Sequence, residues 1–139
     1  MSNTATATRP LQGRTALVTG SGRNIGRSIA VRFAEAGANV VLNGRRDLEA
    51  LEKVAREVEA CGVQAMCVLA DVSRPDEVEQ MVNDASARFG KIDIAVSNVG
   101  LRPHQAFLDI TVEDWRSVLE SSLSSAFYLG VCAAERLAG

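Results

Sequence analysis

The sequence predicts an α/β fold in which helices cover both faces of a parallel sheet, a doubly wound arrangement of about four strands in the order βαβαβαβα. Short apolar runs alternate along the chain with longer segments whose apolar residues recur at helical spacing. The first three helical segments end near Gly37, Gly62 and Gly90, as helix C-termini often do. Strands that alternate with helices form βαβ units, and such units build parallel sheets with right-handed crossovers.

The first strand and helix are the most clearly marked elements. Residues 15–18 form a short apolar run that predicts a buried strand. Apolar side chains then recur at Ile25, Ile29, Phe33 and Ala36. This spacing places them on one face of a helix that packs against the sheet.

The second strand and helix follow directly. Residues 39–43 predict another buried strand. Asp47 is predicted to be the N-cap of the next helix, because acidic side chains accept N–H groups at helix starts. The apolar face of that helix consists of Leu48, Leu51, Val54 and Val58.

The remaining elements repeat the alternation. Residues 63–69 and 92–97 predict the third and fourth strands. Residues 73–76 (SRPD) resemble a capping box with a proline near the first helical position. A second capping box at residues 111–114 (TVED) precedes a long helix predicted over residues 115–137.

Composition limits the classes of partner. The 139 residues are 47% hydrophobic, which suffices for one domain with a core. The 15 basic and 17 acidic residues give a net charge of -2, which argues against nucleic acid or an anionic membrane surface. Cys61, Cys67 and Cys132 lack metal-ligand spacing and lie in apolar surroundings. They predict reduced thiols in a cytoplasmic protein without a metal site.

The chain divides into two regions. Residues 1–13 are rich in threonine and alanine and have no apolar core, so they predict a flexible N-terminal arm rather than a signal peptide. Residues 14–139 contain no repeat, low-complexity segment or internal boundary. They are predicted to form one domain.

The nucleotide site is predicted at residues 18–26, VTGSGRNIG, which join the first strand to the first helix. A helix that follows a glycine-rich turn presents free backbone N–H groups and a positive dipole end to a phosphate. Gly20 and Gly22 permit positive φ angles and close approach to a ligand. The G-x-G-x-x-G fingerprint is not met, because Ile25 stands at the third glycine. The alternative is a strand–helix connection that binds nothing.

Residues 19–26 resemble the T-G-x-x-x-G-x-G turn of the short-chain dehydrogenase/reductase family. The middle glycine of that pattern is Asn24 here. Asparagine is the side chain that best tolerates the left-handed region, and it is also a favoured N-cap. The resemblance therefore predicts that the backbone of the turn is kept while an amide enters the phosphate site.

The end of the second strand bears on the choice of coenzyme. Gly44 stands where dinucleotide-binding folds commonly carry the acid that holds the ribose 2′-hydroxyl of NAD. Arg45 and, from the glycine-rich turn, Arg23 would complement a 2′-phosphate. We therefore expect NADP(H) to be preferred, with NAD(H) possible. Asp47 is a rival acid, although its position favours the capping role.

Two further strand ends carry family motifs. The resemblance implies that Asp71 and Val72 meet the adenine; the alternative is that Asp71 only shapes the turn before Ser73. Residues 97–100 (SNVG) resemble the family's N-N-A-G, which implies that Asn98 adjoins the ribose and pins neighbouring strands, and that Gly100 lets the backbone pass the coenzyme. The predicted coenzyme-binding residues are Gly20, Ser21, Gly22, Arg23, Asn24, Ile25, Gly26, Arg45, Asp71, Val72, Asn98 and Gly100.

The family's chemistry depends on a Tyr-x-x-x-Lys pair that is not found here. The only tyrosine is Tyr128, and Cys132 stands four residues after it. Ser122 occupies the position of a family asparagine that helps a proton relay. We therefore predict no catalytic residue in this chain.

The resemblance implies the N-terminal, Rossmann-type half of an NADP(H)-dependent oxidoreductase for small carbonyl or alcohol substrates. Within the family, the general pattern of the sequence is similar to that of 3-oxoacyl-[acyl-carrier-protein] reductases. This half is expected to be inactive alone and to form a homo-oligomer in the full-length protein. The alternative is a non-catalytic module for nucleotide binding or dimerisation.

Overall fold

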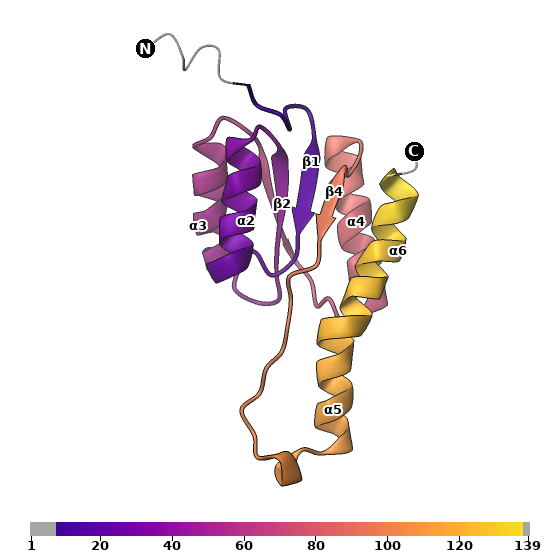
Figure 1. Ribbon diagram of the computed structural model, residues 1–139. Helices are drawn as coiled ribbons and strands as arrows, with labels where there is room; N and C mark the ends of the chain where they lie inside the picture. The colour runs from indigo at the N-terminus through magenta and orange to yellow at the C-terminus, as the bar shows by residue number, and fades with distance from the viewer. Residues whose placement is uncertain (1–7, 138–139) are drawn as a thin grey trace.

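The computed structural model describes residues 8–137 and contains one parallel sheet (Figure 1). Its strands are β1 (Thr15–Val18), β2 (Asn39–Gly44), β3 (Ala65–Leu69) and β4 (Ile94–Val96). They lie in the order β3-β2-β1-β4, and every pairing is parallel. The predicted α/β fold is therefore confirmed.

Helices cover both faces of this sheet (Figure 1). Helices α2 (Asn24–Glu35) and α3 (Leu48–Glu59) lie on one face. Helices α4 (Pro75–Phe89) and α6 (Ser125–Leu137) lie on the other. The result is a three-layer arrangement with the central strands enclosed between helices, as parallel sheets require.

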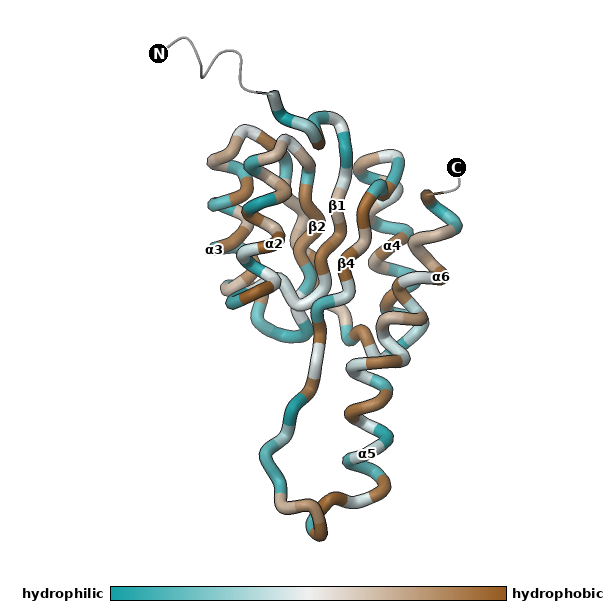
Figure 2. Tube along the Cα trace, in the orientation of Figure 1, coloured by the Kyte–Doolittle hydropathy of each residue, from teal (hydrophilic) through white to brown (hydrophobic). Residues whose placement is uncertain are grey.

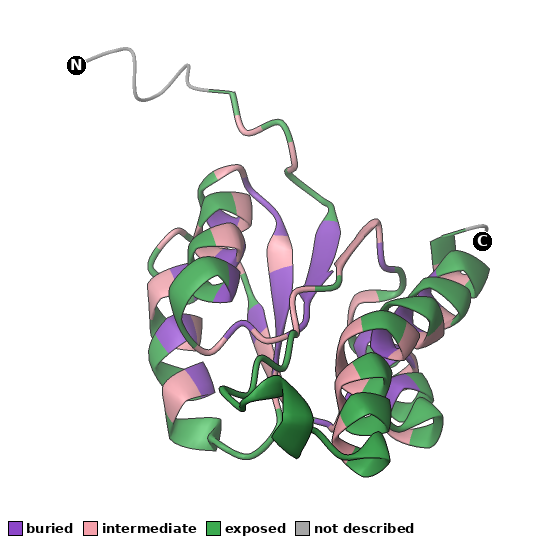
Figure 3. Cartoon of the chain, turned by 60° about the horizontal axis from the view of Figure 1, so that its bottom comes forward, coloured by how far each residue is buried: buried purple, intermediate pink, exposed green. Residues whose placement is uncertain are grey.

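The core consists of two apolar clusters, one on each face of the sheet. Neighbouring residues of a strand point to opposite faces, so Leu17 joins the cluster beside α4 and Val18 the cluster beside α3. In β2, Val41 and Val40 divide in the same way. All four side chains are fully buried, and Figure 3 shows burial concentrated in the strands and the helix faces toward them.

The predicted long helix is divided by a change in winding. It begins as α5 (Val112–Leu119), passes through a π-helical turn (Glu120–Ser124) and continues as α6. The predicted capping box is confirmed: Thr111 Oγ1 accepts the Asp114 N–H at 3.0 Å, and the Asp114 carboxylate accepts the Thr111 N–H at 2.9 Å. No residue of α5 is buried, and the helix projects beyond the sheet although it contains hydrophobic residues (Figure 2); the side chains of Val112 and Trp115 are exposed.

The capping box predicted at residues 73–76 is wrong. The N-cap residue of α4 is Arg74, and the helix begins at Pro75. Ser73 instead donates to Asp71 Oδ1 through both its backbone N–H, at 3.0 Å, and its hydroxyl, at 2.6 Å. An Asp side chain commonly forms such a turn with the residue two positions later, and this turn holds Ser73 outside the helix.

Part of the predicted N-terminal arm is docked on the domain. Residues 1–7 lie outside the described residues. Arg9 Nη2 donates to the carbonyl oxygens of Ala34, at 3.0 Å, and Cys61, at 2.8 Å. The Leu11 N–H donates to the Ala36 oxygen at 2.8 Å. Arg9 and Leu11 thus satisfy carbonyl groups at the ends of α2 and α3, and the flexibility expected of residues 1–13 stays a prediction.

The third and fourth strands are shorter than predicted. β3 begins at Ala65, because the Gln64 N–H is taken by Asn39 Oδ1 at 2.9 Å. β4 begins at Ile94, and the Asp93 carboxylate before it accepts the Thr15 N–H at 2.8 Å. At both strand starts a side-chain hydrogen bond thus adds to a backbone one, from the Val40 N–H to the Gln64 oxygen at 3.0 Å and from the Asp93 N–H to the Thr15 oxygen at 2.8 Å. Across residues 8–137, every helix is too short or too polar to cross a bilayer.

Candidate functional site

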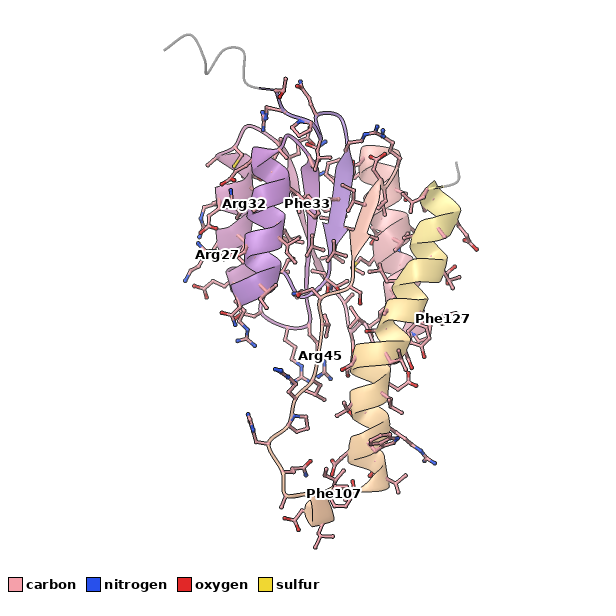
Figure 4. All side chains as sticks on the ribbon, viewed as in Figure 1. Arg27, Arg32, Phe33, Arg45, Phe107 and Phe127 are labelled. Carbon is pink, nitrogen blue, oxygen red and sulfur yellow. The ribbon has the colours of Figure 1, made fainter. Side chains whose placement is uncertain are left out.

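A groove of about 750 Å³ lies at the carboxyl ends of β1, β2 and β4. This is the edge at which open parallel sheets bind ligands. Figure 4 shows Arg45 beyond the strand ends on this side of the sheet. The predicted site residues that line the groove are Gly20, Gly22, Arg23, Asn24, Ile25, Arg45, Asn98 and Gly100.

The glycine-rich turn lies against the start of α2. Gly20 has a φ of 60°, in the region that favours glycine. Gly26 is buried under the turn, and a Cβ added there would lie 2.6 Å from Asn98 Nδ2 and 2.8 Å from the Gly20 carbonyl carbon. Gly26 therefore supports the turn from below and does not line the groove.

Asn24 adopts the backbone that its residue type predicts, with a φ of 52°. Its predicted role as N-cap is wrong, because the N-cap is Arg23 and makes no side-chain capping hydrogen bond. The first turn of α2 thus lacks a side-chain cap. In such helices an anion can supply the acceptors that the free N–H groups need.

Asn43 ties three strand ends together beneath the turn, and sequence reasoning did not identify it. Its Oδ1 accepts the Gly20 N–H at 3.3 Å, and its Nδ2 donates to the oxygens of Val68, at 3.3 Å, and Ala70, at 3.2 Å. The Asn43 N–H donates to Ser21 Oγ at 2.9 Å, so the Ser21 hydroxyl faces β2 and not the groove. One signal was available: Asn43 is a polar residue in an apolar strand, and buried polar groups need partners.

Asn98 joins the ends of β1 and β4. Its Nδ2 donates to the Gly20 oxygen at 3.1 Å, and its backbone N–H donates to Thr19 Oγ1 at 3.0 Å. The Thr19 hydroxyl in turn donates to the Val96 oxygen at 3.3 Å. The pinning of neighbouring strands that the family resemblance implied for Asn98 is thus present in the geometry.

The groove is strongly positive. Arg23, Arg45, Arg46 and Arg102 line it; Arg102, from the loop after β4, was missed by the sequence reasoning. Among the described residues that line the groove, Asp47 is the only acid. Asp47 Oδ1 accepts an N–H from the first turn of α3 at 2.9 Å, which confirms the predicted capping role. A ligand with several phosphate charges would be complementary to this arrangement.

The position of the expected acid is crowded. A Cβ added at Gly44 would lie 3.3 Å from Leu51 Cγ, tighter than ordinary contact. Packing of α3 against β2 thus favours glycine at this position, and the neighbouring cation Arg45 faces the groove in its place.

Asp71 lies beside the groove without lining it. Its Oδ2 is 3.4 Å from Arg45 Nε, while Oδ1 holds Ser73. Partial burial opposes ionisation of Asp71, but the Ser73 hydrogen bonds and the Arg45 and Arg74 cations outweigh it and lower its pKa. Val72 packs in the core cluster beside α4, away from the groove.

Comparison with known proteins gives the family. The sequence model of the short chain dehydrogenases matches residues 14–138. The chain belongs to this family. It is 35% identical over 114 residues to a 3-oxoacyl-[acyl-carrier-protein] reductase, FabG, of Staphylococcus epidermidis, and the match covers 82% of the chain and 47% of that protein. This short-chain dehydrogenase chain thus spans about half the length of the curated relatives it matches.

Solved structures of related proteins extend the comparison. A short-chain dehydrogenase from Burkholderia cenocepacia, in complex with NADP, matches with a TM-score of 0.89 and 34% identity over 92% of this chain and 52% of that one. One from Mycobacterium paratuberculosis, bound to NAD, matches with a TM-score of 0.84 and 30% identity over the same shares. Family members with this fold therefore bind either coenzyme.

Tyr128 does not lie in the groove of this short-chain dehydrogenase. Its hydroxyl donates to Glu120 Oε2 at 2.8 Å across the π-helical turn. This hydrogen bond, together with partial desolvation and the Glu120 charge, raises the pKa of Tyr128. A tyrosine whose pKa is raised gives up its proton less readily, which does not suit a proton-transfer role near neutral pH. Ser122, in the same turn, accepts the Leu101 N–H at 3.3 Å and so holds the loop after β4.

Proposed function

We propose that this chain is the coenzyme-binding half of a short-chain oxidoreductase that transfers hydride between NADP(H) and a small carbonyl or alcohol substrate. The observation that carries the proposal is the groove at the strand ends, which is lined by four arginines and by the first residues of α2, a helix without a side-chain cap. The family membership of the chain supports the same conclusion.

Each part of the groove suits one part of the coenzyme. The free N–H groups of the first turn of α2 would hold the pyrophosphate. Arg45 and Arg23 would hold the 2′-phosphate, Asn98 would adjoin a ribose, and the Asp71 carboxylate would accept from the adenine amine. When bound, the coenzyme supplies or accepts the hydride.

The proposal gives this chain no proton-transfer group. Tyr128 is engaged with Glu120 outside the groove, and general acid catalysis typically contributes about 100- to 10,000-fold in rate. The chain alone is therefore proposed to bind coenzyme without reducing carbonyls. The full-length protein is proposed to be a cytoplasmic homo-oligomer, supported by three free, half-buried cysteines and by the exposed apolar side chains of Leu123 and Phe127.

The coenzyme preference is tested by titrating NADPH and NADH against the chain and against Arg45→Asp. The parent should bind NADPH more tightly, and the variant should reverse that order. Hydrogen bonds to charged groups contribute about 1.5–3 kcal/mol, so NADPH affinity should fall at least tenfold. Arg32→Asp is the matched control, because Arg32 lies on the outer side of α2 and pairs with Glu35 (Figure 4). Equal affinities of the parent for both coenzymes would contradict the preference.

The half-enzyme proposal is tested by assaying the chain with NADPH and a panel of ketones, beside a version extended through the downstream reading frame. The extended version should turn over substrate, and the 139-residue chain should remain near background. Comparable rates would show that the proposal is wrong. Inactivity of both, with dimerisation through the face that carries Leu123 and Phe127, would favour the alternative of a non-catalytic module; each of these side chains is 68% exposed.

A further inference from the structure

Arg45, the cation proposed to read the 2′-phosphate, already faces an anion of the same chain. Its Nε lies 3.4 Å from Asp71 Oδ2. The Arg45 side chain is 64% exposed, and the Asp71 side chain is 22% exposed. The pair therefore joins an exposed cation to a partly enclosed carboxylate.

Asp71 is fixed in place by its own neighbours. Ser73 donates two hydrogen bonds to Oδ1, and the Asp71 N–H donates to Glu77 Oε1 at 3.0 Å. Glu77 is held in turn by Arg74, whose Nε lies 2.9 Å from Oε2. Asp71 thus keeps its position, and a rearrangement of the pair has to come from Arg45.

We propose that Asp71 moderates the preference for NADP(H) over NAD(H) by competing with the 2′-phosphate for Arg45. With a coenzyme that lacks the phosphate, Asp71 keeps Arg45 neutralised. With a coenzyme that carries the phosphate, Arg45 leaves Asp71 and binds the phosphate. Breaking the ion pair costs free energy only in this case, so it lowers the affinity for NADP(H) and narrows the difference between the two coenzymes. This inference rests on the proposed function of the groove.

The geometry of the pair suits an exchangeable contact. A charge-assisted hydrogen bond is normally about 2.7–2.9 Å long, so the 3.4 Å separation marks a weaker ion pair. Exposed ion pairs shift an equilibrium by about 1.4- to 5-fold. A phosphate dianion offers more acceptors and more charge to the guanidinium than one carboxylate oxygen does. The Arg45–Asp71 ion pair is therefore weak enough for the phosphate to displace Asp71. It is also strong enough to change the ratio of NADPH to NADH affinity.

The test is a double-mutant cycle on the ratio of NADPH to NADH affinity. Asp71→Asn should raise this ratio about two- to fivefold, because Arg45 is then free before the phosphate arrives. Both coenzymes carry the adenine, so the loss of an adenine contact cancels in the ratio. In the Arg45→Ser background, Asp71→Asn should leave the ratio unchanged. Asn can still accept from Ser73, and Asp71→Ser, whose hydroxyl can serve the same turn, repeats the test should the first variant not fold.

The matched control is Asp76→Asn, which removes the same charge from an exposed carboxylate that pairs with Arg74 and not with Arg45. Its effect on the ratio should stay below about 1.4-fold, the lower limit for an exposed ion pair. An unchanged or lower ratio in Asp71→Asn would overturn the inference. An equal rise in the Arg45→Ser background would also overturn it, because simple repulsion of the phosphate by Asp71 would then explain the effect. If the parent chain binds neither coenzyme, the proposed function itself fails; if it binds both and the ratio does not move, only this inference fails.

Discussion

The substitution Gly26→Ala tests whether α2 packs so closely against the glycine-rich turn that a side chain at position 26 destabilises the fold. The added Cβ would lie 2.6 Å from Asn98 Nδ2 and 2.8 Å from the Gly20 carbonyl carbon, a backbone atom that cannot move aside as the end of a side chain can. Overpacking of this kind costs about 1–3 kcal/mol. Displacing Asn98 would cost about 1 kcal/mol more for its hydrogen bond to Gly20. The higher helix propensity of alanine returns up to about 1 kcal/mol.

These contributions leave a net loss of about 1–3 kcal/mol in the free energy of unfolding. Urea unfolding followed by circular dichroism measures that loss, and an NADPH titration should show weaker binding because the turn must shift. Gly130→Ala is the matched control, since it lies in α6 and its added Cβ would meet nothing within 4 Å. The control should gain about 0.5–1 kcal/mol. If Gly26→Ala is as stable as Gly130→Ala and binds NADPH normally, steric closeness does not constrain this turn.

Three further predictions follow from single positions. At Gly100, an added Cβ would meet nothing within 4 Å, so Gly100→Ala should leave the urea midpoint unchanged and weaken NADPH binding. Asn24→Gly should leave NADPH affinity within about twofold of the parent, because the Asn24 amide makes no capping hydrogen bond to the helix N–H groups and glycine adopts its φ of 52°; a marked loss would show that Asn24 holds the coenzyme. Partial burial opposes ionisation of Asp93, but the Thr15 N–H, Arg14 and Lys91 outweigh it and lower its pKa, so its stabilisation is complete above the unfolded pKa of about 3.9 and is lost as pH falls through the folded pKa. Asp93→Asn should flatten that acid limb in urea midpoints measured from about pH 2 to 7, and an unaltered limb would contradict the assignment.

Periodicity and turn chemistry were enough to predict the sheet and its helices. The strands could be predicted from apolar runs alone. The N-cap at Asp47 could be predicted from a carboxylate directly before a helical pattern of apolar residues. The capping box predicted at residues 73–76 does not form for a local reason. The Asp71 carboxylate accepts the Ser73 hydroxyl and holds this residue in a turn before the helix. The π-helical turn at residues 120–124 left no signal in the apolar spacing, since one extra residue in a turn barely changes it.

The candidate site could be predicted where it depends on motifs and not where it depends on contacts between distant segments. Gly20 and Asn98 were found from their motifs. Asn43 was treated only as the end of a strand, because its partners lie on β1 and β3 and meet it only in the folded sheet. The pairing of Arg45 with Asp71 joins the ends of β2 and β3 in the same way.

The burial of Asn43 beneath the turn has a consequence for how this protein can change. Its amide is 1% exposed and holds the strand ends together, whereas Arg23 and Arg45 stand in solvent at the rim of the groove. Replacing a rim arginine therefore leaves the hydrogen bonds of Asn43 intact. Selection removes many amino-acid substitutions because they lower the stability of the protein below the threshold that function requires. Substitutions at the rim avoid that filter, so the charges proposed to select the coenzyme can change while Asn43 keeps the strand ends joined.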